Sequence, residues 1–330
     1  MKKILFASTA LVAFGGAAAA EVALSGRAEI GIVKTSSFDA QFFQDIDVTF
    51  TMSGETDNGL TFGASVDLDE GGDGSDASDV NTEDGGATVF ISGSFGTVTM
   101  GDTDGAMDWA LTEAGNVGNP GSINDDETEH AGHLGAYLDG FGNNDGQILR
   151  YDFTAGDFGV AISLESDDGV TGNTITGTQA ATTGTDGYGF AIGLKYNLDL
   201  SGTDVALGLG YQEAEDGGVT GKAVGISASA TFNNGLSAGI TYTDFDKVTA
   251  GGQGVDNHVG IGVGYSTGAL SLHANYGTFD VNDGSGNRDG FGVAAAYDLG
   301  GGAVVHFGYG DSTRSGADAK TASLGLGLSF

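Results

Sequence analysis

The chain has 330 residues, with 62 Gly, one Pro and no Cys, and its 45 acidic against 11 basic side chains give a formal charge of −34 at pH 7. So negative a chain repels phosphate backbones, which excludes nucleic-acid binding. The lack of Cys excludes a disulfide framework and thiolate metal sites. Abundant Gly without a repeat, beside a single Pro, excludes collagen and proline-rich disorder.

The first twenty residues differ in character from the rest. Lys2 and Lys3 precede an apolar run over residues 4–14 and a small-residue end at residues 17–20. This order is typical of a secretory signal peptide, so we expect cleavage before Glu21 and export through the periplasm of residues 21–330. No later segment approaches the roughly 18 uninterrupted apolar residues of a transmembrane helix. The mature chain is therefore either a soluble secreted protein or an outer-membrane β-barrel.

Apolar residues recur at every second position through most of the mature chain. Phe190, Ile192 and Leu194, for example, alternate with small residues. This period predicts β-strands with one apolar face. We predict sixteen strands, of which the first five span residues 22–33, 42–53, 60–69, 87–93 and 96–101 and the other eleven lie between residues 147 and 330.

The connections between the last eleven segments alternate in length. The longer, acidic ones lie near residues 165–187, 213–222, 244–256, 279–288 and 311–320, and between them the links are only a few residues long. Tight turns at one rim and long loops at the other are typical of transmembrane barrels. The fold class is therefore all-β: a closed antiparallel sixteen-stranded transmembrane β-barrel with short periplasmic turns and long extracellular loops.

Aromatic residues gather at the predicted strand ends on the apolar face, as in the two girdles of such a barrel. The short-turn girdle comprises Phe153, Phe158, Tyr196, Phe232, Tyr265, Tyr297 and Phe330, and the opposite girdle comprises Tyr211, Tyr242, Tyr276 and Tyr309.

One connection, residues 103–146, is far longer than the roughly 12–15 residues at which an irregular loop calls for a functional explanation. We expect this inward loop to fold into the lumen and constrict it; the alternative is a solvated acidic surface loop. It has no Lys or Arg. Together with Asp102 at its start, it carries Asp104, Asp108, Glu113, Asp125, Asp126, Glu127, Glu129, Asp139 and Asp145.

Strand parity also assigns charged residues to the lumen wall. If the apolar residues face lipid, the lumen receives Arg27, Glu29, Asp45, Asp47, Arg150, Asp152 and Lys195. Basic residues are few among them, and carboxylates favour cations in a pore, so we predict cation selectivity. Arg27 and Arg150 have a second interpretation of equal weight, in which they only pair with nearby carboxylates.

Two segments carry a family resemblance. Residues 50–64 (FTMSGETDNGLTFGA) and 88–102 (TVFISGSFGTVTMGD), supported by residues 21–26 and the terminal Phe330, resemble hairpins of the porins of purple photosynthetic bacteria and their alphaproteobacterial relatives. The resemblance implies a trimeric sixteen-stranded general porin in the Gram-negative outer membrane, with an inward third loop. It also implies contact with outer-membrane lipids and lipopolysaccharide, and recognition of Phe330 by the barrel-assembly machinery.

At one place the chain departs from this family pattern. The family sets several arginines on the wall just before the segment that matches residues 50–54, whereas this chain has Gln-Asp-Ile-Asp at residues 44–47. We therefore expect a more uniformly negative lumen rather than a field across the pore.

Three functional classes remain open. A barrel of sixteen strands encloses water, which predicts a diffusion channel for small hydrophilic solutes and ions rather than an enzyme. A barrel-borne enzyme such as a lipase would need a Ser/His/acid cluster assembled in space. A soluble calcium-binding roll is suggested by G-G-x-G-x-D matches at residues 71–76 and 251–256, although such rolls need tandem copies.

No cofactor is required for a diffusion channel. Calcium is nevertheless a candidate ligand of Asp102, Asp104 and Asp108, because hard cations bind several carboxylate oxygens. His130 and His133, close to acidic residues of the inward loop, form a weaker metal candidate, and two polar loop histidines are the simpler interpretation.

Overall fold

The structure is a computed structural model that describes residues 21–71, 86–135, 137–138, 147–166, 188–216, 219–250 and 253–330. The predicted signal peptide, residues 1–20, lies outside the described residues, as do Asp139 and Asp145 and most of the first roll-like match. Residues 253–256 of the second match begin a β-strand. Among the described residues, no helix is long and apolar enough to cross a membrane.

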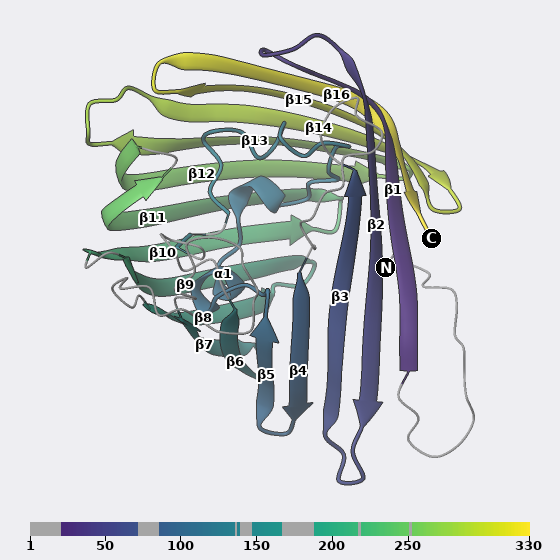
Figure 1. Ribbon diagram of the computed structural model, residues 1–330, viewed down its shortest axis with the longest axis vertical. Coiled ribbons are helices and arrows are strands. Elements are labelled where there is room, and N and C mark those ends of the chain that lie inside the picture. The colour runs from purple at the N-terminus through teal and green to yellow at the C-terminus, as the bar shows by residue number, and fades with distance from the viewer. Residues whose placement is uncertain are drawn as a thin grey trace, which may run out of the picture.

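The described chain forms sixteen strands and two short helical segments (Figure 1). The strands are β1 (Glu21–Thr35), β2 (Gln41–Glu55), β3 (Thr61–Gly71), β4 (Ala87–Gly93), β5 (Gly96–Gly101), β6 (Ile148–Ala155), β7 (Phe158–Ser166), β8 (Tyr188–Asp199), β9 (Thr203–Asp216), β10 (Val219–Phe232), β11 (Leu236–Ala250), β12 (Gln253–Thr267), β13 (Leu270–Val281), β14 (Arg288–Gly300), β15 (Ala303–Arg314) and β16 (Ala317–Ser329). Helix α1 (Ala106–Ala110) and the 3-10 helix η1 (Ala114–Asn116) both lie in the inward loop.

Each strand pairs antiparallel with its neighbours in sequence, and β1 pairs with β16 to close the barrel. The backbone N–H of Phe330 donates to the carbonyl of Gly26 at 2.8 Å, which extends this closing ladder to the last residue. Closure leaves no unpaired strand edge, which a sheet surrounded by lipid could not tolerate. The predicted fold class is confirmed.

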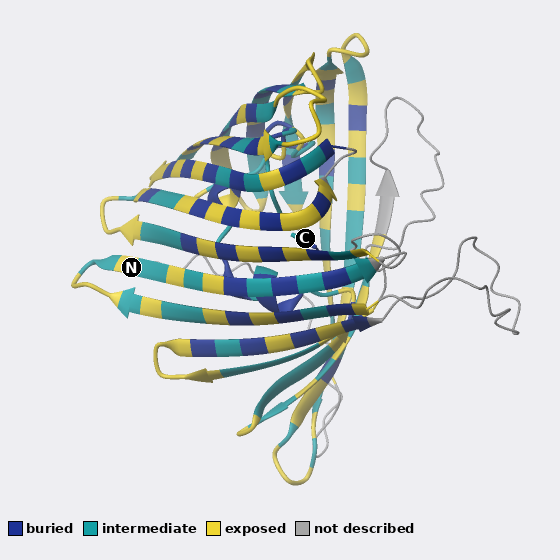
Figure 2. Cartoon of the chain, turned by 90° about the vertical axis from the view of Figure 1, so that its left-hand side faces the viewer, coloured by how far each residue is buried: buried dark blue, intermediate teal, exposed yellow. Residues whose placement is uncertain are grey.

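Burial alternates along the strands in the opposite sense to that of a soluble protein (Figure 2). Large apolar side chains are exposed on the outer face, such as Ile226 at 53% and Leu324 at 56%. Small and polar residues face inward and are covered, as Ala191 and Ser227 are. The buried apolar cluster therefore lies inside the barrel, between the wall and the inward loop.

Several strands run further than their apolar pattern suggested. Only residues 217–218 separate β9 from β10, and only residues 251–252 separate β11 from β12, although longer loops were expected there. The ladder continues because backbone pairing does not depend on apolar side chains, which end where the barrel leaves the lipid. A register shift between Asp244 and Val248 marks this extension in β11.

Aromatic contacts are found at both predicted girdles. The ring centroids of Phe158 and Tyr196 lie 4.2 Å apart at the short-turn rim. At the opposite rim the hydroxyl of Tyr211 donates to Glu213 at 2.6 Å. An amphipathic ring with its polar end toward a carboxylate suits the boundary between lipid and water.

Candidate functional site

The inward loop lies along the inner wall of the barrel (Figure 1). Helix α1 contacts β6 to β9, and η1 contacts β11 to β13. Further along, Ile123 reaches Gly31 of β1 and Gly325 of β16. The expected inward folding is confirmed, and the loop follows the wall over most of its circumference.

Glycines on the wall make this close approach possible. A Cβ at Gly193 would overlap the carbonyl oxygen of Ala106, and one at Gly262 would overlap that of Ala114. These glycines occupy lumen positions of strands whose outer positions are large and apolar. Their role is to leave room for another backbone.

Polar wall side chains bind the loop backbone. The hydroxyl of Ser163 accepts from the N–H of Ala106 at 2.8 Å, and that of Ser227 accepts from the N–H of Thr112 at the same distance. The hydroxyl of Thr241 donates to the carbonyl of Thr112 at 2.7 Å. Since the loop has little regular secondary structure, these bonds satisfy backbone groups that its own helices do not.

Apolar packing holds the first part of the loop. Met107 is fully buried, and with Leu111 and Leu138 it forms one cluster with wall residues such as Ala214 and Phe245. Trp109 packs at the edge of this cluster, with Nζ of Lys195 3.4 Å from its ring centroid. The loop is thus a packed element rather than a solvated surface loop.

The basic wall residues expected in the lumen are all there, and each has a partner. Arg27 forms an ion pair with Glu29 at 2.5 Å. Nε of Arg150 lies 3.4 Å from Oδ1 of Asp152, and Nη1 of Arg150 donates to the carbonyl of Asp104 at 2.6 Å.

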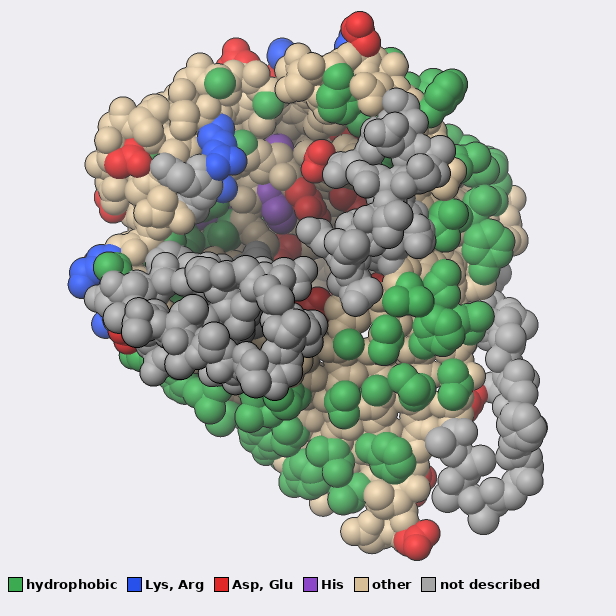
Figure 3. Space-filling view, in the orientation of Figure 1, with side chains coloured by type: hydrophobic (Ala, Val, Ile, Leu, Met, Phe, Trp, Pro, Cys, Tyr) green, Lys and Arg blue, Asp and Glu red, His purple; other side chains and the backbone are tan. Residues whose placement is uncertain are grey.

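Asp45 and Asp47 lie opposite Glu29 and Arg27 in the β1–β2 register. They share a face with Phe43, which packs against Ile123 of the inward loop, and this places both carboxylates on the lumen side. In Figure 3, acidic and histidine side chains are visible in the opening of the barrel, whereas hydrophobic ones cover its outer surface.

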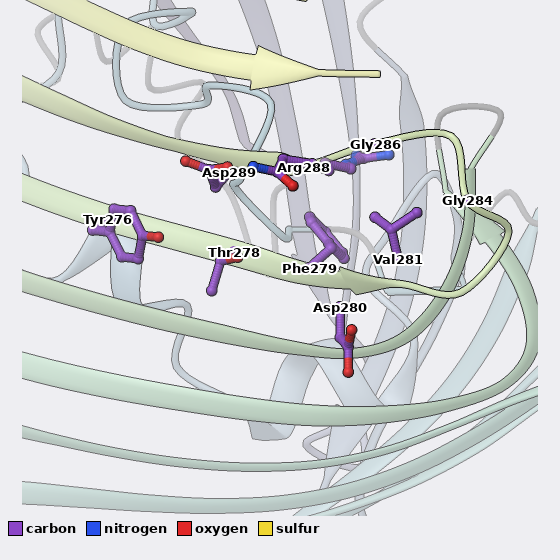
Figure 4. A pocket seen from close by; sticks show the side chains of 10 residues that line it. Tyr276, Thr278, Phe279, Asp280, Val281, Gly284, Gly286, Arg288 and Asp289 are labelled. Atoms are coloured by element: carbon purple, nitrogen blue, oxygen red, sulfur yellow. The ribbon is translucent and has the colours of Figure 1, made fainter. Parts of the chain in front are cut away.

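Sequence reasoning missed two basic lumen residues, Arg288 and Arg314, which lie directly opposite each other on β14 and β15. Nε of Arg288 donates to the carbonyl of Ala131 at 2.9 Å, and its guanidinium lies 4.3 Å from the ring centroid of Phe279. Figure 4 shows Arg288 and Phe279 in a pocket at the end of the β13–β14 hairpin. The sequence does contain a signal for Arg288, because it has the same strand parity as the lumen residue Gly292.

Among the loop carboxyls that the structure describes, Glu113 has the most strongly raised pKa. Burial raises its pKa to about 7, and repulsion from Glu129 and Asp104 adds to this effect. Its side chain accepts a hydrogen bond from Asn116 and lies 3.7 Å from Nε2 of His133. The charge of Glu113 therefore changes near neutral pH.

The other acidic residues of the loop differ in exposure. Asp102, Asp104, Asp126 and Glu129 are exposed, whereas Asp108 and Asp125 are half-buried. Burial, with repulsion from Asp125 and Asp126, raises the pKa of Glu129.

Glu127 corrects the expectation that every loop carboxylate faces the channel. Its side chain is fully buried between the loop backbone and the barrel wall. Its two carboxylate oxygens accept hydrogen bonds from Ser122 at 2.6 Å and from Thr321 of β16 at 3.3 Å. The side chain fills the space over Gly308, so it belongs to the attachment of the loop and not to the water-filled side.

The metal candidates find no support in the part of the chain that the structure describes. No three His, Cys, Asp or Glu side chains are arranged there to hold a metal ion. Burial lowers the pKa of both His130 and His133 to about 4, so these histidines are neutral at neutral pH. Nδ1 of His130 accepts from the N–H of Gly132 at 3.1 Å, which is a structural role.

Comparisons with known proteins agree with this architecture. The family model described as Gram-negative porin matches residues 7–317. A porin of Rhodobacter capsulatus is 32% identical over 321 residues, covering 94% of this chain and all of that protein. A porin structure refined at 1.8 Å resolution is 27% identical with a TM-score of 0.68, and a variant of the Rhodopseudomonas blastica porin is 19% identical with a TM-score of 0.68; each alignment covers 94% of this chain and all of the other.

Proposed function

This chain belongs to the Gram-negative porin family, and from that premise we propose that the channel it forms in the outer membrane passes cations in preference to anions. Family and fold identify a channel protein rather than an enzyme. As a general porin it provides a water-filled path for small hydrophilic solutes and ions.

The observation that carries the proposed selectivity is that basic side chains inside the barrel are paired, whereas acidic side chains of the loop are exposed to water. Among the basic lumen residues that the structure describes, Arg27, Arg150, Lys195 and Arg288 are each held by a carboxylate, a carbonyl or an aromatic ring. By contrast, carboxylates such as Asp104 and Asp126 are exposed along the loop, whose residues 103–146 include no Lys or Arg. A negative potential in the narrow part raises the local concentration of cations.

The test is the reversal potential of the purified channel in a planar bilayer under a salt gradient. We expect the cation-selective sign, with a preference that weakens as the Debye length falls from about 10 Å at 0.1 M to about 3 Å at 1 M salt. Replacing Asp104, Asp108 and Glu113 by Asn or Gln should reduce the preference. The matched control replaces three carboxylates on the outer face, Glu213, Asp244 and Asp311. An anion-selective sign, or equal effects of the two triple variants, would overturn the proposal.

We also propose that three copies of the chain associate. The support is the family, together with small residues on the outer face where subunits could approach closely, such as Ala228 and the cross-strand pair Ala230 and Ala238. Cross-linking in mild detergent should give trimers. Only monomers over a range of cross-linker concentrations would contradict this.

Export and assembly complete the proposal. Residues 1–20 would direct export through the periplasm, and Phe330 would be read by the barrel-assembly machinery before the barrel enters its lipid and lipopolysaccharide environment. Phe330 is 68% exposed, so its ring is accessible at the end of the closing ladder. Deleting Phe330 should lower the amount of folded protein in isolated outer membranes, measured by heat-modifiable gel mobility against the intact chain. An unchanged amount would argue against a signal at this residue.

A further inference from the structure

Three of the five histidines of the chain lie on the barrel wall and bind the inward loop. Nε2 of His258 lies 2.8 Å from the carbonyl oxygen of Gly132. Nδ1 of His273 lies 3.1 Å from that of Val117, and Nδ1 of His306 lies 3.0 Å from that of Gly121. A carbonyl can only accept, so each ring nitrogen donates.

The three histidines occupy successive places around the lumen, on β12, β13 and β15. Each is at most 6% exposed, so the rings are enclosed between the wall and the loop. Their three bonds fall on residues 117–132 of the loop. This segment follows η1 and contains no helix or strand. Turns within it pair some backbone groups, such as the N–H of Thr128 with the carbonyl of Asp125, and the carbonyls that the histidines bind find their partners on the wall.

The wall beside these histidines is lined with glycine. A Cβ at Gly277 would overlap the carbonyl of Gly132, and one at Gly264 would press on Gly118. Glycine allows the loop backbone to approach but offers no side-chain donor. Imidazole is long and flat enough to reach a carbonyl across such a surface, whereas the shorter Ser and Thr bind residues 106–112. Asn275 and Arg288 add two further wall donors, to the carbonyls of Thr128 and Ala131.

Residues 117–132 also carry two of the exposed loop carboxylates, Asp126 and Glu129. The position of this segment therefore sets both the free cross-section and the place of its charges. We propose that His258, His273 and His306 are positioning residues, here called the histidine clasp, that fix the width of the channel by holding residues 117–132 against the wall. This inference rests on the proposed function as an open diffusion channel.

The conductance experiment compares loss of the donor with its retention. In the double variant His273→Leu/His306→Leu the two carbonyls lose their donors, and we expect lower mean single-channel conductance with an increase of about twofold or more in open-channel current noise, as a released loop samples the lumen. In His273→Asn/His306→Asn an amide N–H stands near the place of Nδ1, and values close to wild type are expected. Ser323→Ala removes a buried wall hydroxyl that makes no hydrogen bond and is the matched control.

A second measurement does not depend on conductance. The chain has no Cys, so Ser122→Cys introduces a single thiol. This position is fully buried on the side of the loop that faces the wall. Its labelling rate by a water-soluble thiol reagent should rise about tenfold when His306→Leu is added, because one lost hydrogen bond of about 1.4 kcal/mol shifts local opening by that factor. Adding His306→Asn should leave the rate near its starting value.

Unchanged conductance, noise and labelling in the Leu variants would overturn the histidine clasp, as would Asn variants that behave like the Leu variants. Gel mobility of the unheated barrel checks that each variant is folded. A wild-type protein that forms no channel would instead contradict the proposed function, and the labelling result would still decide whether the clasp holds the loop.

Discussion

Gly193 of β8 lies directly beneath the carbonyl of Ala106, the first residue of α1, so closely that no side chain fits between them. Gly193→Val should push α1 off the wall and into the lumen and lower the single-channel conductance. The cost to loop docking should be about 1–3 kcal/mol, the usual range for overpacking. The measurement is conductance in planar bilayers.

Gly26→Ala is the control for this substitution, because a Cβ at Gly26 would make only ordinary contacts at 3.4 Å or more. Equal conductance of the Gly193→Val channel and the wild type would mean that α1 does not border the open path.

The raised pKa of Glu113 predicts that the ion selectivity depends on pH. Its pKa is raised to about 7, so the carboxyl is protonated and neutral below that pH and becomes charged as the pH rises through it. The cation preference should therefore increase between pH 6 and pH 8. Reversal potentials at the two pH values measure it. Glu113→Gln should remove most of this change, and a change that persists in the variant would assign it to another group.

Glu127 and Glu129 allow a comparison of two neighbouring carboxyls. Glu127 is fully buried, whereas Glu129 is exposed on the channel side of the loop. Glu129→Gln should weaken the cation preference, whereas Glu127→Gln should leave it nearly unchanged, since the amide keeps an oxygen that can accept from Ser122. A larger loss of selectivity in Glu127→Gln than in Glu129→Gln would show that the loop presents the opposite face to the water.

Trp109 is the only tryptophan, so its fluorescence reports on the docking of α1. Lys195→Met removes the ammonium over its ring, an interaction worth about 0.5–2 kcal/mol. We expect the accessibility of Trp109 to a neutral quencher such as acrylamide to rise. The control is Lys222→Met, which removes a lysine on the outer face. If quenching is the same in both variants, the contact between Lys195 and Trp109 does not stabilise the docked loop.

The strands illustrate what could be predicted without coordinates. In β14, Phe291 and Val293 alternate with Gly290 and Gly292, and that local period is enough to predict a strand and its two faces, because neighbouring side chains of a strand must point in opposite directions. The same rule placed Arg27, Glu29 and Asp45 on one side of the wall. It would also have placed Arg288 there had it been applied to that residue.

The inward loop illustrates where such prediction ends. Its length and acidity predicted a constriction, but Glu127 and Glu129 are indistinguishable by composition and are only two positions apart. Their different exposure depends on which wall residues contact the loop. The side chain of Glu127 packs over Gly308 and accepts a hydrogen bond from Thr321.

The sequence by itself therefore determined the number of strands, the lipid and lumen faces and the long loop, since each of these follows from local periodicity and length. Only the tertiary structure decided which loop carboxyls reach water, which basic residues are paired, and that His258, His273 and His306 meet the loop backbone. The three histidine contacts join residues more than one hundred positions apart, and they depend on a loop path that no local pattern encodes.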